Sequence, residues 1–92
     1  MKHVVASRRF QKQLNELPMD QLEKALETID AFRKVLGKNI LPKGLGLKKI
    51  DHNKYEIRID LKTRIGITEN DDTFVLELVG NHEDIRNFLK NY

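Results

Sequence analysis

Apolar and charged residues alternate along one stretch in the second half of the chain. The apolar positions are Tyr55, Ile57, Ile59 and Leu61 and, after a short polar turn, Ile65 and Ile67. A period of two is typical of strands with one buried face, so the stretch predicts a hairpin. In that hairpin Arg58 and Arg64 lie together on the face opposite the apolar side chains. Because neighbouring arginines repel each other, this face favours a polyanionic ligand.

Helical periodicity precedes the hairpin. Ser7 is predicted to cap a first helix that Pro18 ends, and Asp20 to cap a second helix that Gly37 follows. The apolar stripes are Phe10, Leu14 and Leu17 in the first helix and Leu22, Ala25, Leu26, Ile29, Phe32 and Leu36 in the second. Each stripe covers one helical face, so we expect a helical hairpin lying on a sheet.

Further strands are predicted on either side of these elements. Residues 2–6 include enough β-branched side chains for a short strand, and residues 74–79 are almost wholly apolar, as in a central strand. Residues 39–46 contain glycine and proline and predict a loop. The strand after this loop carries Leu45, Leu47 and Ile50, and its alternation slips at Lys48 and Lys49, as at a bulge.

A last helix is predicted after Asn81, which can act as its cap. Its apolar stripe is Ile85, Phe88, Leu89 and Tyr92. The predicted fold class is α+β: an N-terminal strand and a helical hairpin packed on a mainly antiparallel twisted sheet, with a short C-terminal helix. We expect a single domain over residues 1–92.

Charge and composition narrow the function. The net charge is +3, yet residues 43–68 hold seven basic and three acidic side chains, so this segment carries +4 and the remainder −1. A local excess of this kind favours nucleic acid or an acidic protein segment. The absence of cysteine excludes disulfides, thiolate metal sites and thiol catalysis. No apolar run is typical of a signal peptide or a membrane span, so we expect a cytoplasmic protein without membrane contact.

Four runs of sequence together resemble one known family. They are Leu-Pro-Lys-Gly-Leu-Gly-Leu-Lys-Lys-Ile at 41–50, Tyr-Glu-Ile-Arg-Ile-Asp at 55–60, Thr-Arg-Ile-Gly-Ile at 63–67 and Val-Gly-Asn-His-Glu-Asp-Ile-Arg at 79–86. In this order, and after a helical hairpin, they resemble the RelE/ParE toxin superfamily of bacterial and archaeal toxin–antitoxin modules. The resemblance implies an endoribonuclease that cleaves mRNA in the ribosomal A site without a metal or other cofactor. It also implies a cognate antitoxin protein as partner.

The resemblance assigns roles to individual residues. Arg64 matches the arginine that binds the scissile phosphate, and His82 lies where relatives of the YafQ type have a catalytic histidine. Lys48 and Lys49 lie where RelE-like toxins place cations that contact the RNA backbone. Arg58 is expected to join the catalytic set, although an ion pair with Glu56, Asp60 or Glu77 explains it equally well. Lys54 and Arg86 complete the expected RNA-binding residues.

Proton transfer is the least defined part of this expectation. RNA cleavage without a metal needs a base for the 2′-hydroxyl, positive charge for the phosphorane and an acid for the leaving oxygen. His82 is the leading base or acid, because histidine titrates near neutrality from an unperturbed pKa of about 6.5. RelE itself has a tyrosine at the position of Phe88, which carries no proton to transfer. His52 could compensate only if its turn folds inward.

Two other functions fit the same resemblance. A ParE-like toxin would inhibit DNA gyrase by protein binding, and a catalytically inactive relative would only bind its antitoxin. Arg64 and His82 at the family positions favour the ribonuclease, whereas Phe88 is compatible with the ParE-like alternative. A surface histidine beside a helix cap is the simpler explanation of His82 when the resemblance is set aside.

Overall fold

A five-stranded sheet organises the described part of the molecule. The computed structural model describes residues 3–37 and 47–91. The elements are β1 (His3–Ala6), α1 (Arg8–Asn15), α2 (Met19–Gly37), β2 (Leu47–Asp51), β3 (Lys54–Arg58), β4 (Arg64–Asn70), β5 (Thr73–Gly80) and α3 (His82–Asn91). Within the described residues the strand order is β1-β5-β4-β3-β2, with β1 parallel to β5 and the other neighbours antiparallel. The predicted α+β fold, with its mainly antiparallel sheet, is confirmed.

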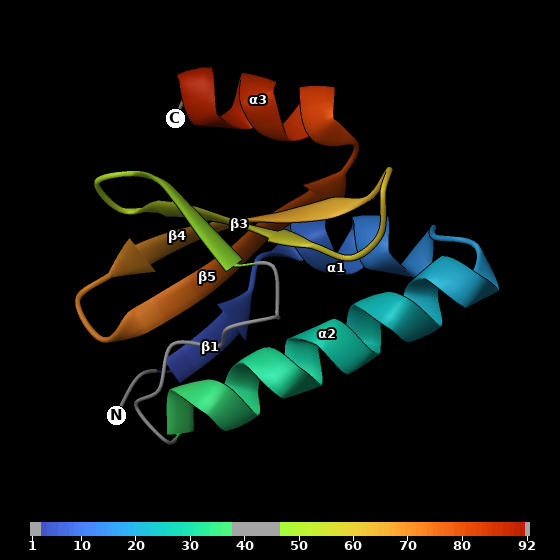
Figure 1. The fold of residues 1–92 in the computed structure, drawn as a ribbon, viewed down its shortest axis with the longest axis horizontal. Helices are drawn as coiled ribbons and strands as arrows, with labels where there is room; N and C mark the ends of the chain where they lie inside the picture. The colour runs from blue at the N-terminus through green and yellow to red at the C-terminus, as the bar shows by residue number, and fades with distance from the viewer. Residues whose placement is uncertain (1–2, 38–46, 92) are drawn as a thin grey trace.

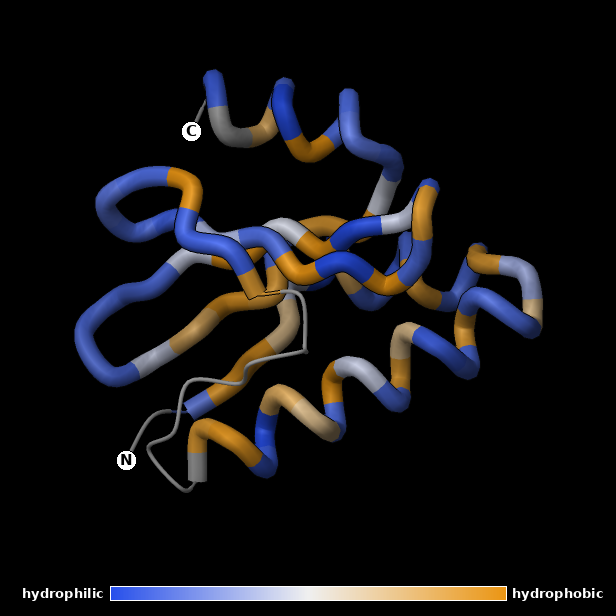
Figure 2. Tube along the Cα trace, in the orientation of Figure 1, coloured by the Kyte–Doolittle hydropathy of each residue, from blue (hydrophilic) through white to orange (hydrophobic). Residues whose placement is uncertain are grey.

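Helices cover both faces of the sheet (Figure 1). The hairpin of α1 and α2 packs on one face, and hydrophobic positions recur along α2 between hydrophilic ones (Figure 2). The main core there consists of Phe10, Phe32, Ile57, Ile65, Ile67, Phe74, Leu76 and Val79. The other face carries α3 over a smaller cluster of Leu78, Ile85 and Phe88. The apolar stripes predicted from the sequence therefore pack in two separate layers, but the prediction is wrong for Leu26 of α2, which is 51% exposed.

Where β1 ends, side chains of α1 and of its cap bind the backbone groups of β5 that β1 no longer pairs. The Ser7 hydroxyl donates to the Glu77 carbonyl at 3.0 Å, and Arg9 Nε donates to the same carbonyl at 3.3 Å. Gln13 Oε1 accepts the Val79 N–H at 3.0 Å. Buried backbone groups need partners, and α1 supplies them where the strand ladder stops. The chain therefore enters α3 from a fixed point.

The β3–β4 hairpin has the predicted register. Ile57 pairs with Ile65 on the core face, and Arg58 pairs with Arg64. One prediction about this hairpin is wrong: Leu61 does not belong to the core but is 86% exposed. The strand ends early because Asp60 Oδ1 accepts the backbone N–H groups of Lys62 and Thr63, which closes a tight turn.

The helix boundaries differ from the sequence prediction at two ends and one cap. The first helix ends at Asn15, so Leu17 packs on the core from beyond it, and Gly37 is the last residue of α2 and does not follow it. Ser7 caps α1 by accepting the Phe10 N–H at 3.0 Å, as predicted. Asp20 is not the cap of α2, because the helix begins at Met19 and the Leu22 N–H already donates to the Pro18 carbonyl at 2.9 Å. None of the helices in residues 3–37 and 47–91 is both long and apolar enough to span a membrane. The predicted loop at 39–46, with Leu45, lies outside the described residues, as do Tyr92 and the side chain of Leu89.

Candidate active site

The first turn of α3 is fixed by a reciprocal cap. Asn81 Oδ1 accepts the Asp84 N–H at 2.8 Å, and Asp84 Oδ2 accepts the Asn81 N–H at 2.9 Å. This pattern satisfies two backbone donors at the helix start and confirms Asn81 as the cap. His82 is the first residue of α3, so the cap also sets where its imidazole lies.

Close packing of α3 on the sheet depends on a position without a side chain. A Cβ atom on Gly66 would lie 2.6 Å from Leu78 Cδ2 and 3.1 Å from Phe88 Cδ2. Ile85 and Phe88 are 1% and 7% exposed, and together with Leu78 they form the whole cluster between α3 and the sheet in the described residues. Phe88 therefore serves packing, and no proton donor or acceptor comes from its position.

A pocket of about 340 Å³ opens between α3, β2 and β3. His82 lines it, together with three cations, two carboxylates and an apolar pair. The cations are Lys48, Arg86 and Lys90, the carboxylates are Asp51 and Glu56, and the apolar side chains are Ile50 and Ile85. The cations outnumber the carboxylates, so the pocket favours an anion.

Arg64 contacts Glu56, which is one of the residues that line this pocket. Its Nη1 lies 3.2 Å from Glu56 Oε2, and the two side chains are only 16% and 8% exposed. Arg64 Nε is buried and has no hydrogen-bond partner. Across the sheet Arg64 pairs with Gly80, two residues before His82. The arginine and the histidine expected to act together therefore lie on the same side of the sheet, beside the same pocket.

Glu56 is the site residue that sequence reasoning missed. It was considered only as one possible partner of Arg58, yet it pairs with Arg64. Glu56 lies directly opposite Gly66 in the ladder, so Arg64 is its diagonal neighbour on the same face. Diagonal neighbours are within reach of long side chains. Alternation alone places Glu56 on this face, which is the signal that could have found it.

His82 contacts Arg86, which also belongs to α3. Arg86 Nη2 lies 3.2 Å from His82 Nε2, at the i,i+4 spacing of neighbouring helical positions. A guanidinium can only donate, so this hydrogen bond uses the unprotonated form of Nε2. Arg86 therefore orients the imidazole with its basic nitrogen toward the guanidinium.

The two lysines of β2 lie on opposite faces. Lys48 pairs with Glu56 and lines the pocket, whereas Lys49 pairs with Tyr55 and its Nζ lies 5.9 Å from the centre of the Tyr55 ring. The register shifts between Lys49 and Asp51, close to the predicted bulge. Successive residues of a strand point to opposite faces, so only one of these lysines can share the face of Arg64, and it is Lys48.

Tyr55 serves packing rather than binding. Its ring stacks edge-on against Phe74 at 5.5 Å, and its hydroxyl donates to Glu69 Oε1 at 2.9 Å. Burial raises the pKa of Tyr55, and the hydrogen bond to Glu69 adds to the effect. The sequence-based assignment of Tyr55 to the core is confirmed.

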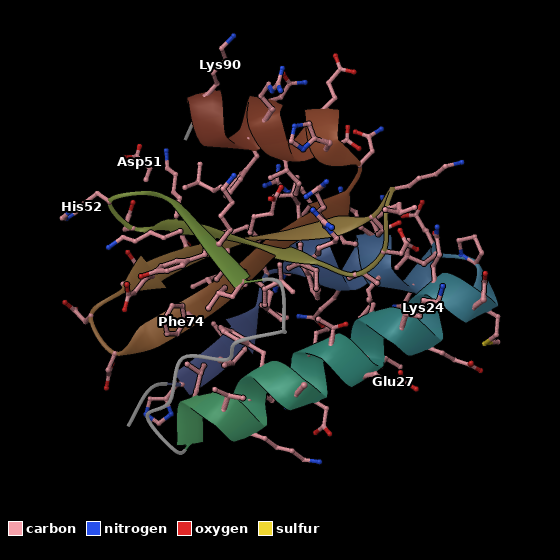
Figure 3. All side chains as sticks on the ribbon, viewed as in Figure 1. Lys24, Glu27, Asp51, His52, Phe74 and Lys90 are labelled. Carbon is pink, nitrogen blue, oxygen red and sulfur yellow. The ribbon has the colours of Figure 1, made fainter. Side chains whose placement is uncertain are left out.

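Three expected site residues lie elsewhere. Lys54 is only 8% exposed, because its side chain is buried within the face that α3 covers; it is not presented to RNA as expected. Arg58 is exposed and lines a different hollow, with Lys24 of α2. His52 lies at the exposed tip of the β2–β3 turn and points away from the molecule (Figure 3).

Metal ligands do not gather anywhere in residues 3–37 and 47–91. No group of three or more histidine, cysteine, aspartate or glutamate side chains is close enough there to hold an ion. The pocket combines one imidazole, one guanidinium group and two ammonium groups, the residue types that bind and cleave phosphodiesters by charge stabilisation and proton transfer.

Toxins of known structure share this architecture. A chain of the RelB–RelE antitoxin–toxin complex from Methanococcus jannaschii is 28% identical, with a TM-score of 0.69 over 91% of this chain and 96% of that chain. A chain of the RelE–RelB complex from Pyrococcus horikoshii is 20% identical, with a TM-score of 0.66 over 87% and 93%. YafQ from E. coli is 12% identical, with a TM-score of 0.64 over 92% and 98%.

These likenesses define a RelE-like fold. The chain is similar to RelE and YafQ toxins along almost its whole length, so the resemblance to the RelE/ParE superfamily that its sequence carries is confirmed. No protein-family model and no curated protein matches the sequence.

Proposed function

We propose that this protein is the toxin of a type II toxin–antitoxin module and that it cleaves mRNA on the ribosome. One observation supports the proposal: the pocket beneath α3 is lined by His82, Lys48 and Glu56, and Glu56 is in turn paired with Arg64. An imidazole next to fixed cations is the arrangement that metal-independent RNA cleavage requires. The RelE-like fold supports the same conclusion.

Each residue has a role in the proposed reaction. His82 Nε2 exchanges its hydrogen bond with Arg86 for one with the 2′-hydroxyl of the bound RNA, and takes the proton of that hydroxyl while its oxygen forms a bond to the adjacent phosphorus. The bond from phosphorus to the 5′-oxygen breaks, and the leaving oxygen takes a proton from water, which leaves a 2′,3′-cyclic phosphate. Arg64 stabilises the negative charge that develops on the phosphorane. Glu56 is a positioning residue, because it holds the guanidinium of Arg64 at 3.2 Å.

Cations around the pocket would bind the RNA backbone. Lys48, Arg86 and Lys90 line it from β2 and α3, and all three are exposed. Contacts of lysine and arginine with phosphates weaken as salt rises, because bound counterions are released on binding. Lys49 faces the other side of the sheet and Lys54 is buried, so neither belongs to the proposed contact surface.

A cognate antitoxin is the proposed protein partner. The neighbours from Methanococcus jannaschii and Pyrococcus horikoshii were solved as complexes of RelE with RelB, and YafQ was solved in complex with DinJ. By analogy, we expect a small protein that binds this chain and blocks the pocket. An acidic segment would complement the cations at its rim.

The test compares variants of the site with matched controls. Purified protein is added to translating ribosomes, and the new RNA ends are mapped by primer extension. His82→Ala should slow cleavage by about 10²–10⁴-fold, the usual worth of a general acid or base. Arg64→Lys should slow it by about 10²–10³-fold, because the lysine keeps a charge opposite Glu56 but loses the guanidinium geometry.

The controls are His52→Ala and Arg8→Ala, which remove the same residue types from exposed positions outside the pocket. Both should cleave at the rate of the unmodified protein. Equal cleavage by His82→Ala and His52→Ala would remove the proposed site. Intact messages together with inhibited DNA gyrase would instead support the ParE-like alternative, which stays a prediction until this assay is done.

A further inference from the structure

A second cationic hollow lies between α2 and the β3–β4 turn. It measures about 530 Å³ and shares no lining residue with the pocket beneath α3. Lys24 of α2 lines it from one side, and Figure 3 shows this lysine on the half of α2 nearer that turn. Gln21 of α2 lies on the same side as Lys24, whereas Arg58 and Lys62 line the other side, together with Asp60 and Leu61.

The three cations of this hollow outnumber its one carboxylate, Asp60, whose pKa the charge of Lys24 helps to lower. Among the residues that the structure describes, no ion pair joins Lys24, Arg58 or Lys62 to a carboxylate. The one acidic neighbour, Asp60, uses Oδ1 to accept the N–H groups of Lys62 and Thr63 at 2.9 and 2.7 Å. The backbone hydrogen bond from Lys62 is also the main reason why the pKa of Asp60 is lowered. The carboxylate is committed to the turn, and the hollow keeps an excess of positive charge.

The hollow and the candidate active site are linked by neighbouring residues of the sheet. Arg58, which lines the hollow, is the direct cross-strand partner of Arg64, whose own partner Glu56 lines the pocket. Side chains directly opposite each other in antiparallel strands lie about 5 Å apart at Cβ. Two like charges at this spacing destabilise the hairpin, and an anion bound across both of them removes the repulsion. A row of cations therefore runs from Lys48 to Lys24.

We propose that the hollow of Lys24, Arg58 and Lys62 is a second phosphate-binding subsite for the RNA strand whose scissile phosphate lies at Arg64. This inference rests on the proposed function and extends it to a longer stretch of single-stranded RNA. The subsite reads charge and not sequence, because its lysines and arginine contact backbone phosphates. Leu61, 86% exposed at its rim, offers apolar surface to a ribose or a base edge.

The experiment measures RNA binding as a function of RNA length. Fluorescence anisotropy is recorded with uncleavable 2′-O-methyl RNAs of about 4 and about 12 nucleotides, a range that matches single-strand binding sites. The test variant is Lys24→Gln/Lys62→Gln. The control variant is Lys12→Gln/Lys34→Gln, which removes the same charge from exposed positions outside both cavities. Circular dichroism melts verify that both variants fold.

The proposal predicts a loss confined to one variant and one RNA. The test variant should bind the longer RNA about tenfold more weakly than the control, and its slope of log K against log salt should be smaller by about 1.4, the value for two lost phosphate contacts. Both variants should bind the shorter RNA equally, because that RNA is held at the pocket.

Three results would overturn the proposal. If both variants bind the longer RNA with equal affinity and salt slope, the hollow is not a subsite, while the proposed function stands. If the unmodified protein binds neither RNA, this inference fails, while the proposed function is decided separately by the cleavage assay on ribosomes. If the test variant keeps its RNA affinity but loses binding of poly-glutamate, the hollow belongs to an acidic protein partner instead.

Discussion

Glu56→Gln separates the positioning of Arg64 from the binding of RNA. At 3.2 Å, the attraction between the Arg64 and Glu56 charges is about 5 kcal/mol for an effective dielectric constant of about 20. Much of this gain is offset by the loss of hydration, because the side chains are only 16% and 8% exposed. Glutamine keeps an acceptor for the guanidinium, so we expect the variant to lose about 2 kcal/mol of stability, below the roughly 3–5 kcal/mol for breaking a fully buried pair.

Urea unfolding of Glu56→Gln, Arg64→Gln and the double variant measures this pair directly. A double-mutant cycle removes effects that the two substitutions share with other residues, so the remainder is the coupling energy. We expect a coupling of about 2 kcal/mol, above the roughly 0.2–1 kcal/mol of exposed ion pairs. A coupling below that range would show that Glu56 does not hold Arg64 in solution.

Glu56→Gln should strengthen RNA binding but slow cleavage. Removing a carboxylate from the pocket relieves its repulsion of the phosphate by about 1 kcal/mol, so RNA should bind roughly fivefold more tightly. Cleavage should nevertheless slow, because Arg64 loses the partner that orients it. Anisotropy with an uncleavable RNA gives the affinity, and single-turnover cleavage gives the rate. Faster cleavage with tighter binding would refute a positioning role and leave Glu56 as an electrostatic obstacle only.

Two further predictions concern the supports of the site. Gly66→Ala should lower the free energy of unfolding by about 1–3 kcal/mol, because the added methyl group overpacks Leu78 and Phe88. It should also lower cleavage more than His52→Ala does. Equal urea midpoints and equal cleavage rates would contradict the close packing of α3. Asp60→Asn should remove a pH-dependent part of stability. Because the pKa of Asp60 is lowered from its ordinary value of 3.8, its stabilisation is present above 3.8 and is lost as pH falls through the lower folded value. Melting temperatures of the two proteins should therefore differ at neutral pH and converge in acid, and a constant gap would contradict this.

Sequence patterns predicted those parts of the fold that are decided by residues close together in the chain. The register of the β3–β4 hairpin follows from alternation, because a slip by one residue would move every apolar side chain out of the core. The same argument placed Arg58 opposite Arg64. Alternation failed at Leu61, because the pattern continues past the point where Asp60 closes the turn. The sequence does show Asp60, a residue type that forms turns, and its hydrogen bonds to the turn decide where the strand ends more strongly than the apolar side chain of Leu61 does.

Contacts between distant segments could not be predicted in the same way. Which of Lys48 and Lys49 joins the site depends on the residue at which β2 changes register, and the sequence of β2 does not specify it. The partner of Arg64 depends on reach along a diagonal of the sheet. The burial of Lys54 depends on its neighbours across the sheet and on the helix that covers this face. Each of these three features depends on how the strands and helices pack together and not on the sequence of one element.

The candidate site depends on the docking of one short helix. Arg64, the proposed phosphate-binding residue, and its partner Glu56 belong to the central sheet and are held by strand pairing on both sides. The imidazole belongs to α3, which the described residues attach through the Asn81 cap and one small apolar cluster. A helix held by so few buried side chains opens at lower free energy than the sheet beneath it. Cleavage should therefore respond to changes at Gly66 and Phe88 before global stability does, because these residues decide whether His82 stays beside the phosphate.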